Sequence, residues 1–234
     1  MNYTPEQIAE IVLKVLKEVE TPDVSKLSYE EKVKLAKDPN TTVELLKVLA
    51  TDENLAVRFA VRYWVAQNPN TPVELLKVLY TDNYSDVRCG VAKHPNTPVE
   101  LLKVLSTDKV SGVRLGVAKH PKTPVELLKV LATDENPDVR LGVARHPNIP
   151  VEVLKVLATD KNYTVRRGVA EHPNTPVELL KVLADDEVPY VQRAVKENPN
   201  YKSKTLELTA IQYEALKKLI ESGQDESLKG LMDT

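Results

Sequence analysis

Four histidines recur at one position of a repeating pattern and are the first candidates for chemistry. Histidine is the commonest metal ligand and titrates near neutral pH. Each stands directly before a proline: His94, His120, His146 and His172. A metal needs its ligands about 2 Å from one ion, whereas equivalent positions in stacked repeats lie about 10 Å apart. The spacing therefore predicts hydrogen bonding at a helix end, and no metal ligand is assigned.

Aspartate and arginine recur in the same way and could form a charged groove. Both are present in five consecutive repeats, at Asp52, Asp82, Asp108, Asp134 and Asp160 and at Arg58, Arg88, Arg114, Arg140 and Arg166. The alternative is structural: the aspartate caps a helix or pairs with an arginine within or between layers. Because the two residue types recur together, we favour the structural interpretation.

Motifs of known catalytic types are missing from the sequence. There is no Gly-rich phosphate loop, Gly-x-Ser-x-Gly, His-Glu-x-x-His or Cys-x-x-Cys. The single cysteine, Cys89, occupies a position that holds Leu115 and Leu141 in the next two repeats, which indicates a small filler rather than a nucleophile. The sequence predicts a protein that is not an enzyme and has no cofactor.

Composition limits the partner and the compartment. With 32 basic and 34 acidic residues the net charge is −2, which disfavours a nucleic-acid binder. No apolar stretch approaches the ~20 residues of a membrane span, and the N-terminus has no signal-peptide pattern. One cysteine gives no disulfide framework. We expect a soluble cytoplasmic protein that contacts no membrane.

A repeated phrase sets the architecture. The segment from Pro95 to Leu105 recurs with few changes from the equivalent prolines, and the spacing from Pro69 to Pro199 is 26 residues at each step: Pro69, Pro121, Pro147 and Pro173, with a looser copy at Pro39. The step from Pro39 to Pro69 is 30 residues, and the additional turn is assigned to residues 62–65.

Each repeat is predicted to form two short helices. The first begins with a capping box of Thr97 and Glu100 around Pro98, and the second starts near Val113 and ends before Pro121. Glycine, which costs roughly 1 kcal/mol inside a helix, recurs in the second helix and indicates a backbone passing close by. The position holds Gly90, Gly116, Gly142 and Gly168, with Ala60 and Ala194 in the end repeats.

Stacked hairpins of this kind form an all-α solenoid, because one hairpin cannot bury its own apolar stripe. We predict an N-terminal helical cap over residues 1–38, an array of about six repeats over 39–200, and a C-terminal helical cap and tail over 201–234. The caps contain predicted helices at 4–20, 28–38 and 208–222, the first two with capping boxes at Thr4/Gln7 and Ser28/Glu31.

The repeated phrase resembles the leucine-rich repeat variant family over residues 33–200. Residues 139–148 and 175–180 carry the resemblance well, as Val-Arg-Leu-Gly-Val-Ala-Arg-His-Pro-Asn and Thr-Pro-Val-Glu-Leu-Leu. The resemblance implies a right-handed α-superhelix whose second helix is partly 3₁₀, and an interaction module without an activity of its own. Some members carry an N-terminal cysteine cluster for an iron–sulfur centre; this chain has no cysteine before Cys89, so that cofactor is not carried over.

Positions that vary between repeats are the candidates for partner binding. One set is the loop after the first helix, where Tyr84 and Tyr163 stand. The other is an i, i+4 face of the second helix. Its pairs are Cys89/Lys93, Leu115/Lys119 and Leu141/Arg145, followed by Arg167/Glu171 and Arg193/Glu197. This face predicts a site for a protein or peptide with apolar and acidic side chains, although Leu115 and Leu141 could instead pack against a neighbouring layer.

Further alternatives stay open at this point. The aromatic cluster of Phe59, Tyr63 and Trp64 is either a binding hot spot or a filler between the N-terminal cap and the array. The array as a whole is either a binding scaffold, a self-associating structural element that forms a weak homo-oligomer, or a designed, consensus-like solenoid without a natural ligand. Nucleic-acid reading would require a continuous basic or aromatic stripe, which the sequence lacks.

Overall fold

The computed structural model describes residues 22–52, 55–202, 211 and 214. It contains two compact units, Met1–Leu105 and Ser106–Thr234, and each is described by itself. Every regular element within the described residues is helical, which confirms the all-α prediction. The division into caps and array stays a prediction, because the cap helices expected at 4–20 and 208–222 lie outside the described residues, apart from Ile211 and Glu214.

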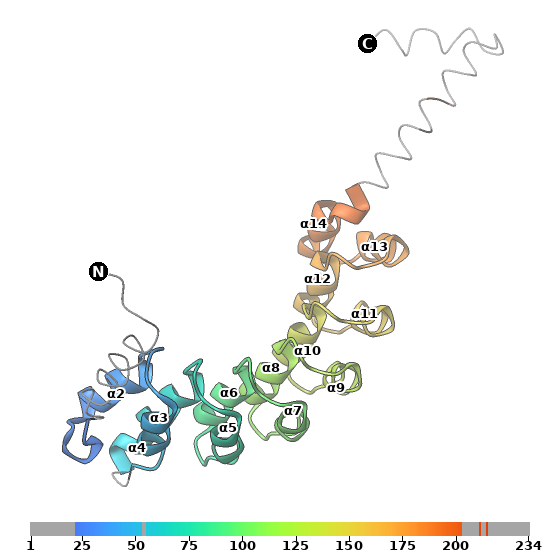
Figure 1. Ribbon diagram of the computed structural model, residues 1–234. Coiled ribbons are helices and arrows are strands. Elements are labelled where there is room, and N and C mark those ends of the chain that lie inside the picture. The colour runs from blue at the N-terminus through green and yellow to red at the C-terminus, as the bar shows by residue number, and fades with distance from the viewer. Residues whose placement is uncertain (1–21, 53–54, 203–210, 212–213, 215–234) are drawn as a thin grey trace, which may run out of the picture. The chain divides into compact units, whose positions relative to one another are not determined.

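The first unit begins with a short 3₁₀-helix and alternates thereafter between two kinds of α-helix. The elements are η1 (Val24–Lys26), α2 (Tyr29–Lys37), α3 (Val43–Ala50), α4 (Leu55–Gln67), α5 (Val73–Leu79), α6 (Ser85–Lys93) and α7 (Val99–Leu105). Helices α2, α4 and α6 pack side by side, and α3, α5 and α7 lie along them (Figure 1). We call α3, α5 and α7 first helices and α2, α4 and α6 second helices.

The second unit repeats the same alternation. It contains the second helices α8 (Ser111–Lys119), α10 (Pro137–Ala144), α12 (Tyr163–Glu171) and α14 (Pro189–Glu197) and the first helices α9 (Val125–Leu131), α11 (Val151–Leu157) and α13 (Val177–Ala184). Second helices pack on second helices in one row, and the first helices form another row beside it (Figure 1). Within each unit this is the predicted solenoid packing. The second helices are α-helical, so the 3₁₀ geometry implied by the family resemblance is not found in them.

The core of both units is built from leucine, valine and alanine. The largest fully buried side chains are two leucines in each first helix: Leu46/Leu49, Leu76/Leu79, Leu102/Leu105, Leu128/Leu131, Leu154/Leu157 and Leu180/Leu183. Second helices contribute valine and alanine, for example Val139, Val143 and Ala144. No aromatic side chain of the described residues is in the buried core. The aromatic residues are therefore placed on the surface or at its edge.

The start of the first helix differs from the predicted capping box. Pro124 is the N-cap of α9 and makes no side-chain cap bond, while the hydroxyl of Thr123 donates to the carbonyl of Val117 in the preceding helix at 2.6 Å. Thr97 and Thr175 do the same, towards Val91 and Val169. The threonine therefore joins the two helices of neighbouring hairpins instead of capping its own. At Ser28 and Glu31 the predicted capping box is confirmed.

The additional turn of the long repeat precedes Arg62 rather than following it. Arg62 bonds Asp82, twenty residues on, as Arg140 bonds Asp160, so Arg62 and not Arg58 occupies the arginine position. The extra residues therefore lie at the start of α4, which is longer than the other second helices. By the same register Trp64, not Ala60, stands at the glycine position. Its ring lies under the Lys37 ammonium of α2, 4.2 Å from the centroid.

Glycine in a second helix makes room for a leucine side chain of the preceding second helix at Gly142 and Gly168. A Cβ on Gly142 would lie 2.8 Å from Cδ1 of Leu115, and one on Gly168 would lie 2.7 Å from Cδ1 of Leu141. The close neighbour is thus a side chain, whereas the sequence indicated a passing backbone. At Gly90 a backbone atom, the carbonyl carbon of Ala66, is among the three nearest atoms, at 3.5 Å, whereas at Gly142 and Gly168 all three nearest atoms belong to side chains.

Candidate functional site

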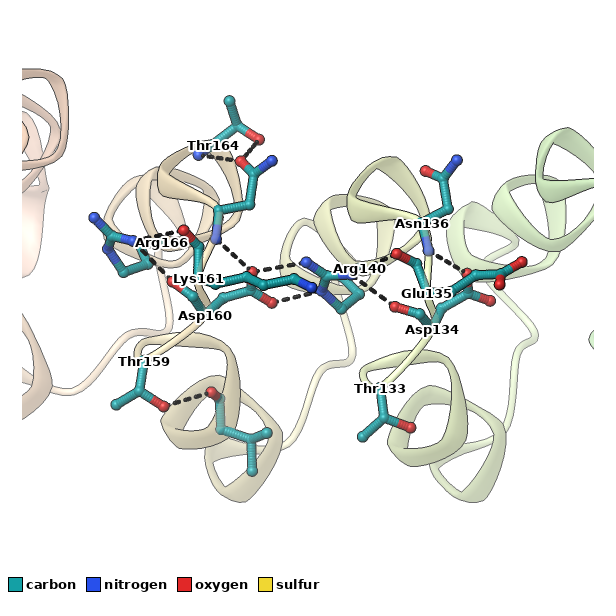
Figure 2. A network of polar contacts seen from close by, with 12 residues as sticks. Thr133, Asp134, Glu135, Asn136, Arg140, Thr159, Asp160, Lys161, Thr164 and Arg166 are labelled. Carbon is teal, nitrogen blue, oxygen red and sulfur yellow. Dashed lines mark hydrogen bonds and ion pairs between the residues drawn. The ribbon is translucent and has the colours of Figure 1, made fainter.

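The recurring arginines and aspartates pair between successive layers. Arg140 donates from Nε and Nη2 to the two carboxylate oxygens of Asp160 at 2.6 and 2.8 Å (Figure 2). Arg114 and Asp134 form the same bidentate pair, as do Arg166 and Asp186. The side chains of Arg140 and Asp160 are only 6% and 8% exposed. The structural interpretation of this ladder is confirmed.

Each arginine also binds the backbone of its own repeat. Nη1 of Arg140 donates to the carbonyls of Asp134 and Glu135, and Oδ1 of Asp160 accepts from the backbone N–H of Asn162 (Figure 2). Burial alone raises the pKa of the Asp160 carboxyl, but the bonds from Arg140 and Asn162 outweigh it and hold this pKa below its usual value. The hydrogen bond to Asp160 in turn raises the pKa of Arg140. The charges of Arg140 and Asp160 therefore pair with each other inside the array. We call the buried side chains that join the layers in this way the frame.

The ladder begins and ends with other residue types. Lys32 of α2 occupies the arginine position and bonds Asp52 at 2.6 Å. In α14 the position holds Gln192, whose amide donates to the carbonyl of Asp186 as the arginines do to their own repeat. Glutamine keeps the bond within the repeat and carries no charge that would need an aspartate of a further layer. Within the described residues, the charged pairs therefore start with Lys32 and Asp52 in the first unit and end with Arg166 and Asp186 in the second.

The histidines form a second ladder of hydrogen bonds. Nδ1 of His146 accepts the backbone N–H of Asn148 at 3.1 Å, so Nε2 carries the proton and donates to the carbonyl of His120 at 3.0 Å. His172 repeats this arrangement on the carbonyl of His146. Asparagine takes the position at Asn68 and Asn198, with its amide donating to carbonyls of the preceding layer. The predicted role in hydrogen bonding at a helix end is confirmed.

Within the described part of the chain, no group of three His, Cys, Asp or Glu side chains is placed to hold a metal ion. In the same residues, no helix has the length and apolar character needed to cross a membrane.

The buried histidine should make stability depend on pH. Burial lowers the pKa of His172, so the unfolded chain binds more protons below about pH 6.5 than the folded one. Its contribution is therefore complete above this pH and is lost as the pH falls towards the folded pKa. We expect His172→Asn, which copies Asn198, to lose less stability than the wild type between pH 7.5 and 5.5 in urea titrations. Equal losses in the two proteins would contradict this assignment.

The variable residues predicted for partner binding are exposed or half-buried in both units. In the first unit Cys89 is half-buried, Lys93 is exposed and Tyr84 is 45% exposed. In the second unit Leu115 and Leu141 are half-buried, Lys119 and Arg145 are exposed and Tyr163 is 42% exposed. The predicted candidates therefore divide between the two units, three in the first and five in the second.

Leu115 and Leu141 contribute to packing between layers. Their Cδ1 atoms cover Gly142 and Gly168, while part of each side chain stays accessible. The charged tips beside them are more exposed, with Arg145 49% exposed where it pairs with Glu171 of the next layer at 2.9 Å. Of the two sets of positions, the leucines and the basic residues four positions later, a partner could therefore contact the basic residues without disturbing the packing between layers.

At the C-terminal end of this face, the charged residues pair with each other. Arg167 donates to Glu171 at 2.6 Å and Arg193 to Glu197 at 2.8 Å, both within one helix. The rings of Tyr163 and Tyr190 lie 6.5 Å apart between centroids. A surface hollow of about 220 Å³ lies between α12 and α14, lined by Arg167, Glu171, Tyr190, Arg193, Ala194 and Glu197.

Two surface features were not predicted from the sequence: the contact of Tyr84 with the aromatic cluster, and a row of exposed valines. Tyr84 joins the aromatic cluster through Phe59, with ring centroids 4.7 Å apart. The first helices expose a valine at one repeated position, between 51% and 64% accessible: Val48, Val78, Val104, Val130, Val156 and Val182. The register of Leu and Val in the phrase Leu-Leu-Lys-Val-Leu could have indicated these valines, because they fall on the opposite side from the two buried leucines.

Successive helical hairpins, joined by side-chain ladders that cross from layer to layer, define an α-helical tandem repeat protein. A scan of protein families matches residues 137–162 and 163–188 to the family described as Leucine rich repeat variant. These two matches confirm, over residues 137–188, the resemblance found in the sequence.

Solved structures with detectable similarity include three repeat-like or engineered chains. One is a leucine-rich repeat variant with a novel repetitive structural motif, 26% identical over 72% of this chain and 80% of the other, with a TM-score of 0.34. The YibA protein of E. coli is 19% identical over 73% and 74% of the chains (TM-score 0.47). An engineered protein is 20% identical over 69% and 96% (TM-score 0.41). No curated protein matches the chain.

Proposed function

We propose that the chain is a non-catalytic scaffold that binds a protein or peptide through the variable face of its second helices. The residues that would carry binding are Cys89, Lys93 and Tyr84 in the first unit and Leu115, Lys119, Leu141, Arg145 and Tyr163 in the second. The partner would present apolar side chains beside acidic ones. With a single cysteine, such a scaffold would suit the reducing cytoplasm.

One observation carries this proposal: the buried polar side chains that join the layers and the exposed basic positions of the face are separate sets of residues. The buried arginine, aspartate, histidine and threonine side chains are bonded inside the array. Lys119 and Arg145, in contrast, are exposed basic groups next to half-buried leucines. A surface of apolar and basic groups on a rigid frame favours an apolar and acidic partner, since opposite charges accelerate and orient association.

The test exchanges charge without disturbing the frame. Glutamate occupies the position of Lys119 and Arg145 in the two following repeats, at Glu171 and Glu197. The double variant Lys119→Glu/Arg145→Glu is therefore expected to remain folded. The matched control is Lys129→Glu/Lys155→Glu, which makes the same charge change on exposed positions of first helices α9 and α11.

A random-sequence peptide library displayed on phage would be selected on each immobilised protein. We expect the wild type and the control to enrich peptides rich in Asp, Glu and apolar residues, and the charge-exchanged variant to lose at least tenfold of their binding. Enrichment of no common pattern, or peptides bound equally by all three proteins, would overturn the proposal. Leu115 and Leu141 are less suitable targets, because they also cover the glycines of the next layer.

A further inference from the structure

The first unit holds a continuous run of aromatic rings that its core does not use. Ring centroids lie 4.7 Å apart for Tyr84 and Phe59, 6.5 Å for Phe59 and Tyr63, and 5.0 Å for Tyr63 and Trp64. We call Tyr84, Phe59, Tyr63 and Trp64 the aromatic run. It contains the only Phe and the only Trp of the chain. None of its members is fully buried, although the core around them consists of smaller apolar side chains.

The structural alternative is that the rings only fill the space between the N-terminal helix and the array. This alternative explains one end of the run. There Trp64 of α4 lies under Lys37 of α2. At the other end Tyr84 is 45% exposed and contacts Phe59 from the next second helix. Equivalent positions in the second unit show that the frame does not need these rings, because Tyr63 corresponds to Leu115 and Tyr84 to Asn136. Partly exposed tyrosine and tryptophan are the residues most enriched in binding hot spots.

Lysine residues lie at the C-terminal ends of helices beside the aromatic run. Helices α2, α4 and α6 pack side by side, and their last residues are Lys37, Gln67 and Lys93. Lys37 and Lys93 are both exposed. Two acidic side chains are exposed as well: Asp38 directly follows Lys37, and Asp86 lies two residues after Tyr84 in the first turn of α6. A partner that follows the rings towards the C-terminus of α6 would therefore meet the positive charge of Lys93.

The backbone of the site limits the conformation of the partner. Phe59, Tyr63 and Trp64 lie on α4, and Tyr84 is the N-cap of α6, so the run presents no sheet edge to which a strand could be added. A polyproline II segment keeps its own backbone solvated and needs no such partner. Aromatic surfaces bind proline-rich segments in this conformation at low entropic cost. The tilted rings, with interplanar angles of 32° and 54°, offer successive faces for proline rings.

We propose that the aromatic run, with Lys37 and Lys93, binds a proline-rich, acidic peptide segment in the polyproline II conformation. This inference rests on the proposed function and names the partner for the first unit. Proline rings stack on Tyr84 and Phe59, and carboxylates of the segment lie near Lys93 and Lys37. Neither backbone rearrangement nor displacement of a frame residue is required.

Trp64, the single tryptophan, makes the site directly observable. The probe is a twelve-residue synthetic peptide of alternating Glu and Pro, titrated into the full chain while Trp64 emission is followed. Anisotropy of the same peptide with a fluorescent label gives a second readout. We expect saturable binding with a dissociation constant below about 1 mM. Peptides of alternating Glu and Ala, or Lys and Pro, should bind at least tenfold more weakly.

The variants use residues already present at equivalent positions of other repeats. Tyr84→Asn copies Asn136, whose side chain caps its helix, and Lys93→Glu copies Glu171. Each should weaken binding of the Glu–Pro peptide at least fivefold, with melting curves confirming the fold. The control Tyr190→Thr, which copies Thr164 of the preceding repeat in the second unit, should leave binding unchanged.

Absence of binding by both readouts at several millimolar peptide would overturn the inference, as would equal binding of the Glu–Ala peptide or insensitivity to Tyr84→Asn. If the phage-selected peptides depend on Lys119 and Arg145 while the Glu–Pro peptide does not bind, the scaffold function stands and the assignment of this partner fails. If the phage selection enriches no peptides but the Glu–Pro peptide binds through Tyr84, the binding site at the aromatic run is supported and the proposed binding face of the second unit fails.

Discussion

Asp160→Ala is expected to lower the free energy of unfolding by about 3–5 kcal/mol. The substitution leaves the buried guanidinium of Arg140 without its bidentate partner and removes the acceptor of the Asn162 N–H. An uncompensated buried charge costs more than the pair contributes, which is why a single deletion has so large an effect. Urea denaturation at pH 7 measures it directly.

Two further variants separate this effect from loss of a surface charge. Glu135→Ala removes a partner of Arg114 that is 86% exposed, and we expect no measurable change. Arg140→Met combined with Asp160→Leu removes both buried charges and should recover most of the stability lost in Asp160→Ala. Equal losses for Glu135→Ala and Asp160→Ala would contradict the assignment of the ladder to the frame.

Gly90→Ala is expected to destabilise the first unit by about 1–2 kcal/mol, although alanine is the better helix former by about 1 kcal/mol. The new Cβ would lie 2.9 Å from the Cβ of Ala66, which is fixed to the backbone of α4. Relief therefore requires α4 and α6 to move apart. Thermal and urea unfolding of the full chain would measure the loss.

Gly168→Ala provides the matched comparison. Its nearest neighbour would be Cδ1 of Leu141 at 2.7 Å, the end of a flexible side chain that can change rotamer. The Cβ of Ala144 at 3.3 Å must yield by only a few tenths of an ångström. We expect the gain in helix propensity to offset this strain, so that stability changes by less than about 1 kcal/mol. Gly168→Ala as damaging as Gly90→Ala would show that backbone proximity is not the deciding factor.

Repetition made the fold predictable, because one phrase supplies many copies of the same signals. The all-helical hairpins, the leucine core and the structural character of the Asp/Arg and His ladders follow from residue types recurring in register. Repetition also misled where one copy departs from the others. Spacing alone allows the additional turn anywhere between Asp52 and Pro69, and only the bond from Arg62 to Asp82 places it at the start of α4.

Prediction failed at Thr97 and Thr123 for a different physical reason. Thr-Pro-x-Glu fits a capping box by spacing, but the hydroxyl has a competing acceptor, a carbonyl in the last turn of the helix before. Which acceptor is nearer depends on the angle between helices, which spacing does not contain. The candidate binding face was predicted as a set of variable positions, yet the aromatic contact between Phe59 and Tyr84 depends on the register of α4 and so required the structure.

Pairing of each arginine with the aspartate twenty residues ahead has a consequence for how such a gene can change. Residues 137–162 contain both Arg140 and Asp160, and residues 163–188 contain both Arg166 and Asp186, so each segment carries one complete pair. Unequal recombination that adds or deletes one whole 26-residue segment therefore adds or deletes one complete pair and leaves the pairs of the other repeats intact. Length can therefore drift by whole repeats without any compensating mutation, whereas a gain or loss of a few residues between an arginine and its aspartate breaks the pair of that repeat.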